Sequence, residues 1–424
     1  MPDERTTSPL WIERLLLLAA AVFVGVNLLA LNLQRASPDW MGLIVWGACA
    51  ALGSLALDRL LPRRDPLPFA LAMLMSGWGL VAIERVAPNF AERQTLWLAV
   101  SAAALVIVAA LPDVLRLLRA YRYTLLVLGL ALLVGTILLG TNPSGQAGAP
   151  ELWLGFGSIF FQPSEPLKII LVAFLASYLS EQYPVLRAEG IDLGGRLRFS
   201  PRIYGPILLM WGISVVILIW QRDLGTAILF FVVFLVLLYV ASGNTLLLLA
   251  GAGLVALAGT AAYWLFSVVQ LRVDIWINPW PEANTRAYQI VQSLMAFAAG
   301  GIFGQGVGQG APSYIPVVHS DFVFAAIGEE WGLLGVIVVI ACFAALVMRG
   351  LRIAVLQGGR PFHTLLTVGL SAVVGLQSLL IMGGVLKLIP LTGVTLPYFS
   401  YGGSSLLTNF VIIALILRLS AGEN

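Results

Sequence analysis

The sequence predicts an all-α integral membrane protein with about twelve transmembrane helices. Two observations carry this prediction. First, 59% of the 424 residues are hydrophobic, 11% are charged and the mean hydropathy is +0.94, values outside the range of soluble globular domains. Second, apolar runs long enough to cross a hydrocarbon layer of roughly 30 Å recur along the whole chain. A polytopic membrane protein accounts for both observations.

The expected spans follow one another along the chain, separated by polar breaks. Each carries few charged residues, as a helix surrounded by lipid requires. The runs before the first long polar loop are 15–33, 41–57, 68–83, 95–111 and 123–140. Those that follow it are 167–180, 203–220, 225–241 and 245–269, and the last are 322–348, 364–386 and 401–417.

Topology follows from the basic residues, because cytoplasmic loops retain Lys and Arg during insertion. With the N-terminus inside, about two thirds of the 24 Lys and Arg residues fall in cytoplasmic segments, so both termini are expected in the cytoplasm. This topology explains the net charge of +3, and no basic cluster combines with an aromatic platform to indicate nucleic-acid binding. Cys49 and Cys342 fall inside predicted spans without metal-ligand spacing and are expected to be buried.

The same topology places the polar motifs on the outer face. The stretches 141–166, 269–321 and 387–400 and the short loop 221–226 lie outside, whereas the Arg-rich cytoplasmic loop 181–202 holds no comparable group. The glycines from Gly300 to Gly310 lack the preceding strand and the Gly-Lys-Ser/Thr ending of a nucleotide loop. Close backbone packing is therefore expected there.

The most informative stretch is His319-Ser320-Asp321, directly before an apolar run that contains Glu329 and Glu330. An ionised carboxylate inside a membrane protein is costly unless it has a partner or a task. Asp321 could be a general base or a metal ligand, or Ser320 or Asp321 could cap the helix. His319 could bind metal, orient Asp321 or be an ordinary polar residue. The two glutamates lie roughly 12–14 Å further along a helix, and a structural polar network is expected for them.

Two more polar groups each keep two explanations. Lys168 follows Glu165 by three positions, on one helix face. It could bind a pyrophosphate or pair with a carboxylate, or extend its amine to the membrane surface. Gln221 and Asp223 could line a site, or Asp223 could pair locally with Arg222.

Six motifs, in this order along the chain, resemble the SEDS family, the RodA, FtsW and SpoVE proteins of bacterial cell elongation, division and sporulation. The resemblance covers residues from about 120 to 418. The motifs are Gln162-Pro163-Ser164-Glu165 with Lys168, Gln221 with Asp223 to Thr226, Tyr288-Gln289 with Gln292-Ser293, the glycines Gly304, Gly306 and Gly308, His319 to Phe322 with Gly328-Glu329-Glu330, and Pro390 to Gly393 leading into Ser400 to Ser405. The resemblance implies a ten-helix core at 91–424 and about two additional helices within 1–90. It also implies a large extracytoplasmic loop at 269–321, between predicted helices 9 and 10.

The same resemblance implies a peptidoglycan glycosyltransferase that polymerises lipid II into glycan strands at the outer face of the cytoplasmic membrane. It would serve cell elongation or division beside a class B penicillin-binding protein, among membrane lipids. Asp321 is implied as the catalytic residue. Joining the acceptor 4-hydroxyl to an anomeric carbon needs a base, and the leaving pyrophosphate needs positive charge or a metal. A divalent cation, Mg²⁺ or Mn²⁺, is therefore expected, with its ligands open and Asp321 a candidate.

Substrate binding is expected of the other motif residues. The end of the chain, where Leu396-Pro397 precedes the Ser400 to Ser405 stretch, could instead be only a kinked helix start built from small residues. The expected substrate-binding residues are Gln162, Ser164, Glu165, Lys168, Gln221, Asp223, Gln289, Gln292, His319, Ser320, Ser404 and Ser405.

Two other classes of function stay open at this stage. A lipid flippase or other transporter also has polar residues in a many-helix core. Alternating access, however, favours internal repeats and ionisable groups near the midplane, and the sequence shows no evident inverted repeat. A noncatalytic scaffold of the elongation or division complex would tolerate the loss of Asp321.

Overall fold

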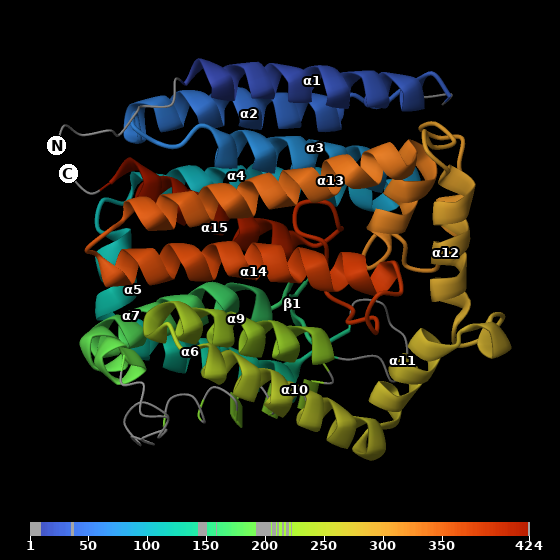
Figure 1. The fold of residues 1–424 in the computed structure, drawn as a ribbon. Coiled ribbons are helices and arrows are strands. Elements are labelled where there is room, and N and C mark those ends of the chain that lie inside the picture. Colours follow the sequence, from blue (N-terminus) through green and yellow to red (C-terminus); the bar gives the residue numbers. More distant parts are fainter. Residues whose placement is uncertain are drawn as a thin grey trace.

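The computed structural model describes residues 10–34, 38–142, 151–157, 159–191 and 223–422, with scattered positions from 205 to 221. Arg222, most of the expected span 203–220 and the second half of the loop 181–202 lie outside the described residues. The helices run side by side as a bundle, and α1 (Trp11–Asn32) begins at the same end of the bundle where α15 (Gly403–Ala421) finishes (Figure 1). We call this the terminal end, and the opposite end the site end.

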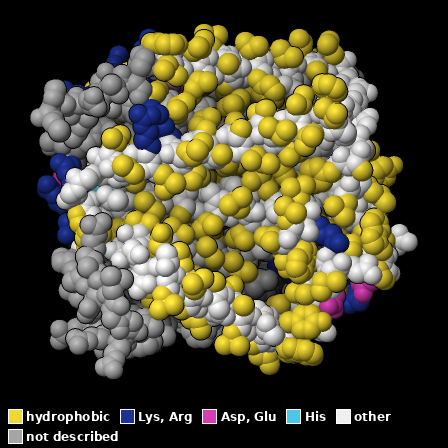
Figure 2. Space-filling view, viewed as in Figure 1, with side chains coloured by type: hydrophobic (Ala, Val, Ile, Leu, Met, Phe, Trp, Pro, Cys, Tyr) yellow, Lys and Arg dark blue, Asp and Glu magenta, His cyan; other side chains and the backbone are white. Residues whose placement is uncertain are grey.

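The predicted fold class is confirmed. Among the described residues, ten helices are long and apolar enough to cross a membrane, so the chain is a multi-pass membrane protein. Besides α1 and α15 they are α2 (Met41–Leu60), α3 (Leu67–Val86), α4 (Pro88–Ala110), α6 (Arg122–Leu139), α9 (Leu224–Ser242), α10 (Thr245–Leu265), α13 (Val323–Leu356) and α14 (Pro361–Val385). A further helix, α7 (Ser164–Ile191), covers the expected span 167–180. Figure 2 shows apolar side chains covering the helices along one face of the bundle, as lipid contact requires.

Short elements join the spans. At the terminal end lies α5 (Val114–Ala120). At the site end, α11 (Ser267–Ile277), α12 (Tyr288–Gly300) and the short 3₁₀ helices η1 (Trp280–Glu282) and η2 (Pro312–Tyr314) form the expected long loop (Figure 1). The loop before α7 holds a small antiparallel hairpin, β1 (Leu154–Phe156) with β2 (Ile159–Phe161), which the all-α prediction did not include.

Helix α3 is the centre of one half of the bundle. Within its membrane-spanning window 89% of the residues are buried, against 39% for α1 and 33% for α2. Small residues make this packing close. A side chain at Gly79 would overlap the backbone of Tyr398 and Phe399, and one at Gly403 would overlap the ring of Trp97.

The segment between α14 and α15, residues 386–402, folds back among the helices without regular structure. Tyr398 and Phe399 in it are fully buried. Non-helical backbone at this depth is tolerated only where protein groups satisfy it. Here Ser400 does so, because its hydroxyl accepts a hydrogen bond from the Leu396 N–H at 2.9 Å. We call this segment, which contacts α9, α11, α14, α15 and the turn that holds Ser320, the connecting segment.

Candidate active site

Asp321 lies in the turn immediately before α13 and is half-buried. The Ser320 hydroxyl donates to its Oδ1 at 2.7 Å. The N-cap residue of α13 is Phe322, and no side chain caps the helix there. The helix-cap alternative for Ser320 and Asp321 is therefore not what the geometry shows, and the second carboxylate oxygen, Oδ2, has no hydrogen bond among the described residues.

Gly393 of the connecting segment separates Asp321 from Arg272 of α11. A Cβ at this glycine would lie 3.7 Å from Asp321 Oδ2 and 3.5 Å from Arg272 Nη2. The other guanidinium nitrogen, Nη1, donates to the carbonyls of Leu391 and Thr392 at 3.2 and 3.0 Å. A cation anchored on the connecting segment thus borders the same space as the free carboxylate oxygen.

Asp223 supplies a second carboxylate to this region. It is the N-cap of α9, where its Oδ1 accepts from the Thr226 N–H at 2.9 Å and its Oδ2 from the Thr226 hydroxyl at 2.6 Å. A Cβ at the adjacent Gly225 would lie 2.9 Å from the Thr392 carbonyl, so the start of α9 presses on the connecting segment. The alternative pairing with Arg222 lies outside the described residues.

Electrostatics couples the three charged groups. Burial raises the pKa of the Asp321 carboxyl, while the Ser320 hydrogen bond and Arg272 act to lower it and Asp223 to raise it. Burial also lowers the pKa of Arg272, opposed by the charges of Asp223 and Asp321. The guanidinium keeps its charge because its ordinary pKa exceeds about 12. Burial lowers the pKa of His319 as well, which favours a neutral imidazole at neutral pH.

His319 and Ser320 are held by backbone contacts to the end of the connecting segment. The Tyr401 N–H donates to the His319 carbonyl at 2.8 Å, and the Ser400 hydroxyl donates to the Ser320 carbonyl at 2.5 Å. The His319 ring lies 4.9 Å from that of Phe90 on α4. These contacts fix the turn that carries Asp321 from outside α13.

Lys168 forms a buried polar chain with residues of α14. Its Nζ donates to Glu165 Oε1 at 2.7 Å and to Gln377 Oε1 at 2.8 Å, and only 3% of the lysine is exposed. The Gln377 amide donates in turn to the Thr395 carbonyl at 2.8 Å. The amine is thus enclosed rather than extended to the membrane surface. Glu165 Oε2 is buried and has no hydrogen-bond partner among the described residues.

Three of the predicted serines connect the hydrogen-bonded groups around Lys168 to neighbouring helices. The Thr395 and Ser405 hydroxyls lie 2.9 Å apart. The Gln162 N–H donates to the Ser404 hydroxyl at 3.0 Å, and the Gln162 side-chain amide donates to the Ser164 hydroxyl at 3.0 Å. The start of α15 is therefore joined both to the loop before α7 and to the connecting segment.

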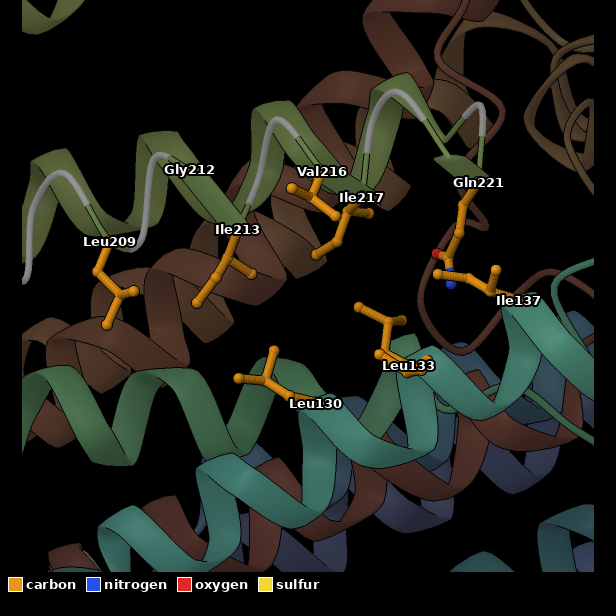
Figure 3. A pocket seen from close by; sticks show the side chains of 10 residues that line it. Leu130, Leu133, Ile137, Leu209, Gly212, Ile213, Val216, Ile217 and Gln221 are labelled. Carbon is orange, nitrogen blue, oxygen red and sulfur yellow. The ribbon is translucent and has the colours of Figure 1, made fainter.

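Gln221 lies at one end of an apolar cavity of about 460 Å³ between α6 and the described residues from Leu209 onward (Figure 3). Aliphatic side chains of both segments, among them Leu133 and Ile213, line the cavity. The Gln221 amide nitrogen donates to the Thr136 hydroxyl at 2.8 Å. Its buried Oε1 has no hydrogen-bond partner among the described residues.

The two predicted glutamines of α12 are less closely tied to Asp321. The Gln289 amide donates to the Pro316 carbonyl at 3.2 Å, in the loop that leads to His319. Gln292 is half-buried on the same helix. Neither has a described hydrogen bond to Asp321, so the geometry assigns Gln289 to the support of the loop.

Glu329 and Glu330 bind the glycine-rich loop, residues 301–311. Glu329 Oε1 accepts from the Ala311 N–H at 2.7 Å. Glu330 accepts from Arg85 Nε of α3 at 2.8 Å and from the Gly308 N–H at 3.2 Å. These contacts have the character of the expected polar network, because each carboxylate joins α13 to other segments.

Arg272, Gln377 and Thr395 were not among the predicted site residues. Gln377 had a signal in the sequence, since it is a lone amide inside the apolar run 364–386. Arg272 had a weaker one, as a cation inside an apolar stretch of the long loop. Thr395 carried none, because only the fold-back of the connecting segment brings it to Gln377.

Residues 67–424 match the family model of the FtsW, RodA and SpoVE proteins, which is described as that of a cell cycle protein. The chain belongs to this family. The matched part begins with α3 and leaves α1 and α2 outside; the domain boundary expected near residue 90 stays a prediction.

Family members with assigned names extend the match. The peptidoglycan glycosyltransferase RodA of Mycobacterium tuberculosis (strain ATCC 25618 / H37Rv) is 36% identical over 97% of this chain and 90% of its own. RodA of Mycobacterium leprae (strain TN) is 36% identical, covering 99% and 93%. These relatives therefore align with α1 and α2 as well.

Solved family structures agree with the fold. The crystal structure of the Thermus thermophilus rod shape determining protein RodA superposes with a TM-score of 0.60 at 26% identity, covering 84% of this chain and 95% of that one. A chain from a study of how a peptidoglycan synthase complex coordinates polymerization and crosslinking gives a TM-score of 0.68 at 27% identity, covering 84% and 96%.

Proposed function

We propose that this chain is a peptidoglycan glycosyltransferase that polymerises lipid II, with Asp321 as its general base. Family membership and the relatives named for this activity support the reaction class. One observation carries the assignment of the base: a Cβ at Gly393 would contact both Asp321 Oδ2 and Arg272 Nη2, so the carboxylate and the guanidinium lie beside the same backbone position. A carboxylate that accepts a proton and a cation that receives negative charge are the two groups this displacement requires.

The proposed step balances without a further acid. The acceptor 4-hydroxyl oxygen forms a bond to the anomeric carbon of the donor, and its proton passes to the Asp321 carboxylate. The bond from the anomeric carbon to the pyrophosphate oxygen breaks, and the lipid pyrophosphate leaves with the electron pair. The leaving group needs no proton because pyrophosphate already stabilises its charge, and the Arg272 guanidinium lies where it can bind that charge.

Substrate binding is proposed for the polar groups around this centre. The Lys168 amine with Glu165, the hydroxyls of Ser404 and Ser405, and the Gln162–Ser164 pair are the candidates, because hydrogen bonds through Gln377 and Thr395 tie Lys168 and Ser405 to the connecting segment. The apolar cavity that ends at Gln221 matches the chemistry of a prenyl chain. Gln221 would then mark where the lipid chain gives way to the polar headgroup.

A divalent cation fits the residues present. Among the described residues no three His, Cys, Asp or Glu side chains form a metal-binding group. Asp321 and Asp223, however, are close enough for their charges to interact. Mg²⁺ is often held by one or two carboxylates together with substrate phosphates. Asp321 and Asp223 are the residues that would hold Mg²⁺ or Mn²⁺, and the ion would supply positive charge to the leaving pyrophosphate.

Topology and partner belong to the same proposal. The terminal end is placed in the cytoplasm and the site end outside, which is supported by exposed arginines at the terminal end, such as Arg63, Arg116 and Arg352. A class B penicillin-binding protein is proposed as the crosslinking partner, supported by the structural relative from a peptidoglycan synthase complex. The transporter and scaffold alternatives gain no observation, because the charged groups proposed for the chemistry, Asp321, Arg272 and Asp223, lie together at the site end.

The decisive test compares purified wild type with Asp321→Asn, each with a class B penicillin-binding protein, lipid II and Mg²⁺ or Mn²⁺. We expect glycan strands from the wild type and none from Asp321→Asn. Asp274→Asn is the matched control, because Asp274 is an exposed aspartate of α11 in the same loop, and it should polymerise normally. Equal polymer from wild type and Asp321→Asn would remove Asp321 from the chemistry.

A further inference from the structure

The first helix of the chain, although outside the part matched by the family model, contacts the elements on both sides of Asp321. We propose that α1 is a positioning element of the active site. Through Asn27, and through Gln34 in the turn that follows the helix, it holds the break in α13 and the glycine-rich loop, and these two elements determine where Asp321 sits. The inference rests on the proposed function of Asp321.

The break in α13 lies at Gly332, where φ is +67° and ψ is −163°. The glycine-rich loop fills it by pairing with the backbone on both sides. A side chain at Gly332 would overlap this loop, and one at Gly304 would overlap the backbone of Glu330. The pairing hydrogen bonds run from Gln305 N to Glu329 O at 2.9 Å, Gly306 N to Glu330 O at 3.0 Å, Leu333 N to Gly301 O at 2.9 Å and Leu334 N to Ile302 O at 3.1 Å.

Asp321 sits between these two elements in the sequence. The glycine-rich loop leads through η2 to the turn of Asp321, and the first part of α13, from Val323 to Trp331, leads from that turn to the break. A shift of the glycine-rich loop therefore displaces Asp321 through the residues that precede it. A shift of the break displaces it through the residues that follow it. Misplacement of a reacting group by about 1 Å can reduce a rate by 10²-fold.

Helix α1 and the turn that follows it contact both elements through polar side chains. The Trp331 indole N–H donates to Asn27 Oδ1 at 3.1 Å, at the residue directly before the break. The Gln34 amide donates to the Val307 carbonyl of the glycine-rich loop at 3.0 Å. The Gln34 side chain also fills the space next to Gly308, where any Cβ would overlap it.

Aromatic packing adds a second connection between α1 and the site. The ring of Phe23 on α1 lies 4.8 Å from that of Trp78 on α3. Trp78 lies 5.5 Å from Trp331 and 5.8 Å from Phe399, which precedes Ser400 in the connecting segment. Since Ser400 donates to the Ser320 carbonyl, the same cluster reaches the turn of Asp321 from its other side.

The terminal end of α1 is fixed as firmly as the site end. Glu13 is fully buried, and its carboxylate accepts from Arg64 Nη2 at 2.7 Å and Nε at 3.0 Å. Asp65, which follows Arg64 in the sequence, accepts a hydrogen bond from Arg349 Nε of α13 at 2.5 Å. Helix α1 is therefore linked to α13 at both ends. A positioning element needs such links if it is to hold α13 in place.

The test measures kcat, the KM for lipid II and the thermal unfolding temperature of variants at these contacts and of matched controls. Asn27→Leu removes the acceptor of Trp331, and Gln34→Glu replaces the donor by an acceptor facing the Val307 carbonyl. Gln34→Lys restores a donor. Val26→Ala and Leu33→Ala are the controls, because Val26 is exposed on α1 and Leu33 is exposed in the turn that follows it.

We expect kcat to fall about tenfold in Asn27→Leu and Gln34→Glu, with KM and unfolding temperature unchanged, and to recover in Gln34→Lys. Trp331→Phe should give at least the loss of Asn27→Leu, because it removes the same hydrogen bond and also alters the ring that packs against Trp78, and the double variant should lose no more than Trp331→Phe alone. The controls should match the wild type.

Two outcomes would overturn the inference. Wild-type kcat in Asn27→Leu and Gln34→Glu would show that Asp321 is positioned without α1. A parallel fall of kcat and unfolding temperature, without recovery in Gln34→Lys, would leave α1 a role in stability alone. Both outcomes are distinct from failure of the proposed function, since that failure would appear as an Asp321→Asn variant that still polymerises.

Discussion

Arg272 Nη2 and Asp321 Oδ2 both border the space that a Cβ would occupy at Gly393, at 3.5 and 3.7 Å. The two residues come from different elements, α11 and the turn before α13, and the connecting segment brings them to one place. The absence of a side chain at residue 393 is therefore a chemical feature of the site, because even a methyl group there would contact both the base and the cation.

Gly393→Ala tests whether a methyl group at this position interferes with the reaction. The substitution adds a methyl group between the two charges and strains a backbone at φ +73°, at a cost of about 1–2 kcal/mol. We expect at least tenfold slower polymerisation. Gly243→Ala is the matched control, because Gly243 has φ +71° and open space around it. Equal stability loss with activity lost only at residue 393 supports the assignment; equal activity in both variants contradicts it.

Arg272→Gln should reduce kcat by about 10²-fold, the effect of removing one group that stabilises developing charge. The loss should appear in kcat more than in the KM for lipid II, since the charge develops in the transition state. Arg286→Gln serves as the control, because Arg286 is an exposed arginine of the same loop paired with Glu282. A wild-type rate in Arg272→Gln would exclude this role.

The pH dependence of polymerisation should report on Asp321. A general base works when deprotonated, so the rate should fall as pH decreases through the pKa of Asp321, which burial raises. Ser320→Ala removes a hydrogen bond that lowers this pKa, so the acid limb of the pH–rate profile should move to higher pH. The plateau at higher pH should remain. An acid limb that does not respond to Ser320→Ala would mean that another group titrates.

Lys168→Met should destabilise the fold strongly, because it leaves the buried Glu165 carboxylate without its cation. Removal of one partner of a buried pair costs about 3–5 kcal/mol. The double variant Lys168→Met/Glu165→Gln should recover most of the unfolding temperature and none of the polymerisation. Recovery of both would assign the pair to structure only, and thermal unfolding in detergent with a lipid II assay separates the two results.

Asp223→Asn should raise the concentration of Mg²⁺ or Mn²⁺ needed for half-maximal polymerisation. Asparagine still caps a helix well, so α9 should keep its N-terminus. The measurement is a metal titration after chelator treatment, with wild type alongside. An unchanged metal requirement would leave Asp223 with the capping role alone.

The spans could be predicted from the sequence because lipid imposes a simple rule of length and polarity on each helix. The motif around Asp321 could be found too, since a carboxylate next to an apolar run is costly without a role. The β1–β2 hairpin could not, because its strands are three residues long and carry no period that distinguishes them from loop.

The partners of the site residues were beyond the sequence for a different reason. Arg272 reaches Asp321 only because residues 386–402 turn back into the bundle, and nothing local in that segment specifies where its carbonyls will point. In the same way, the chain from Lys168 through Gln377 to Thr395 joins three elements far apart in the sequence. Lys168 could be predicted as a candidate from its residue type, whereas tertiary packing determines which groups accept its hydrogen bonds.

The burial of α3 has a consequence for how the protein is made. Helix α3 enters the membrane early, yet part of its surface, around Gly79, is covered by Tyr398 and Phe399, which are synthesised near the end. The Gln94 amide of α4 likewise donates to the Ser400 carbonyl at 3.3 Å, so this hydrogen bond forms only after Ser400 has been synthesised. The bundle thus closes only after translation is nearly complete. A chain cut short before residue 398 would leave this surface open to lipid and to membrane proteases.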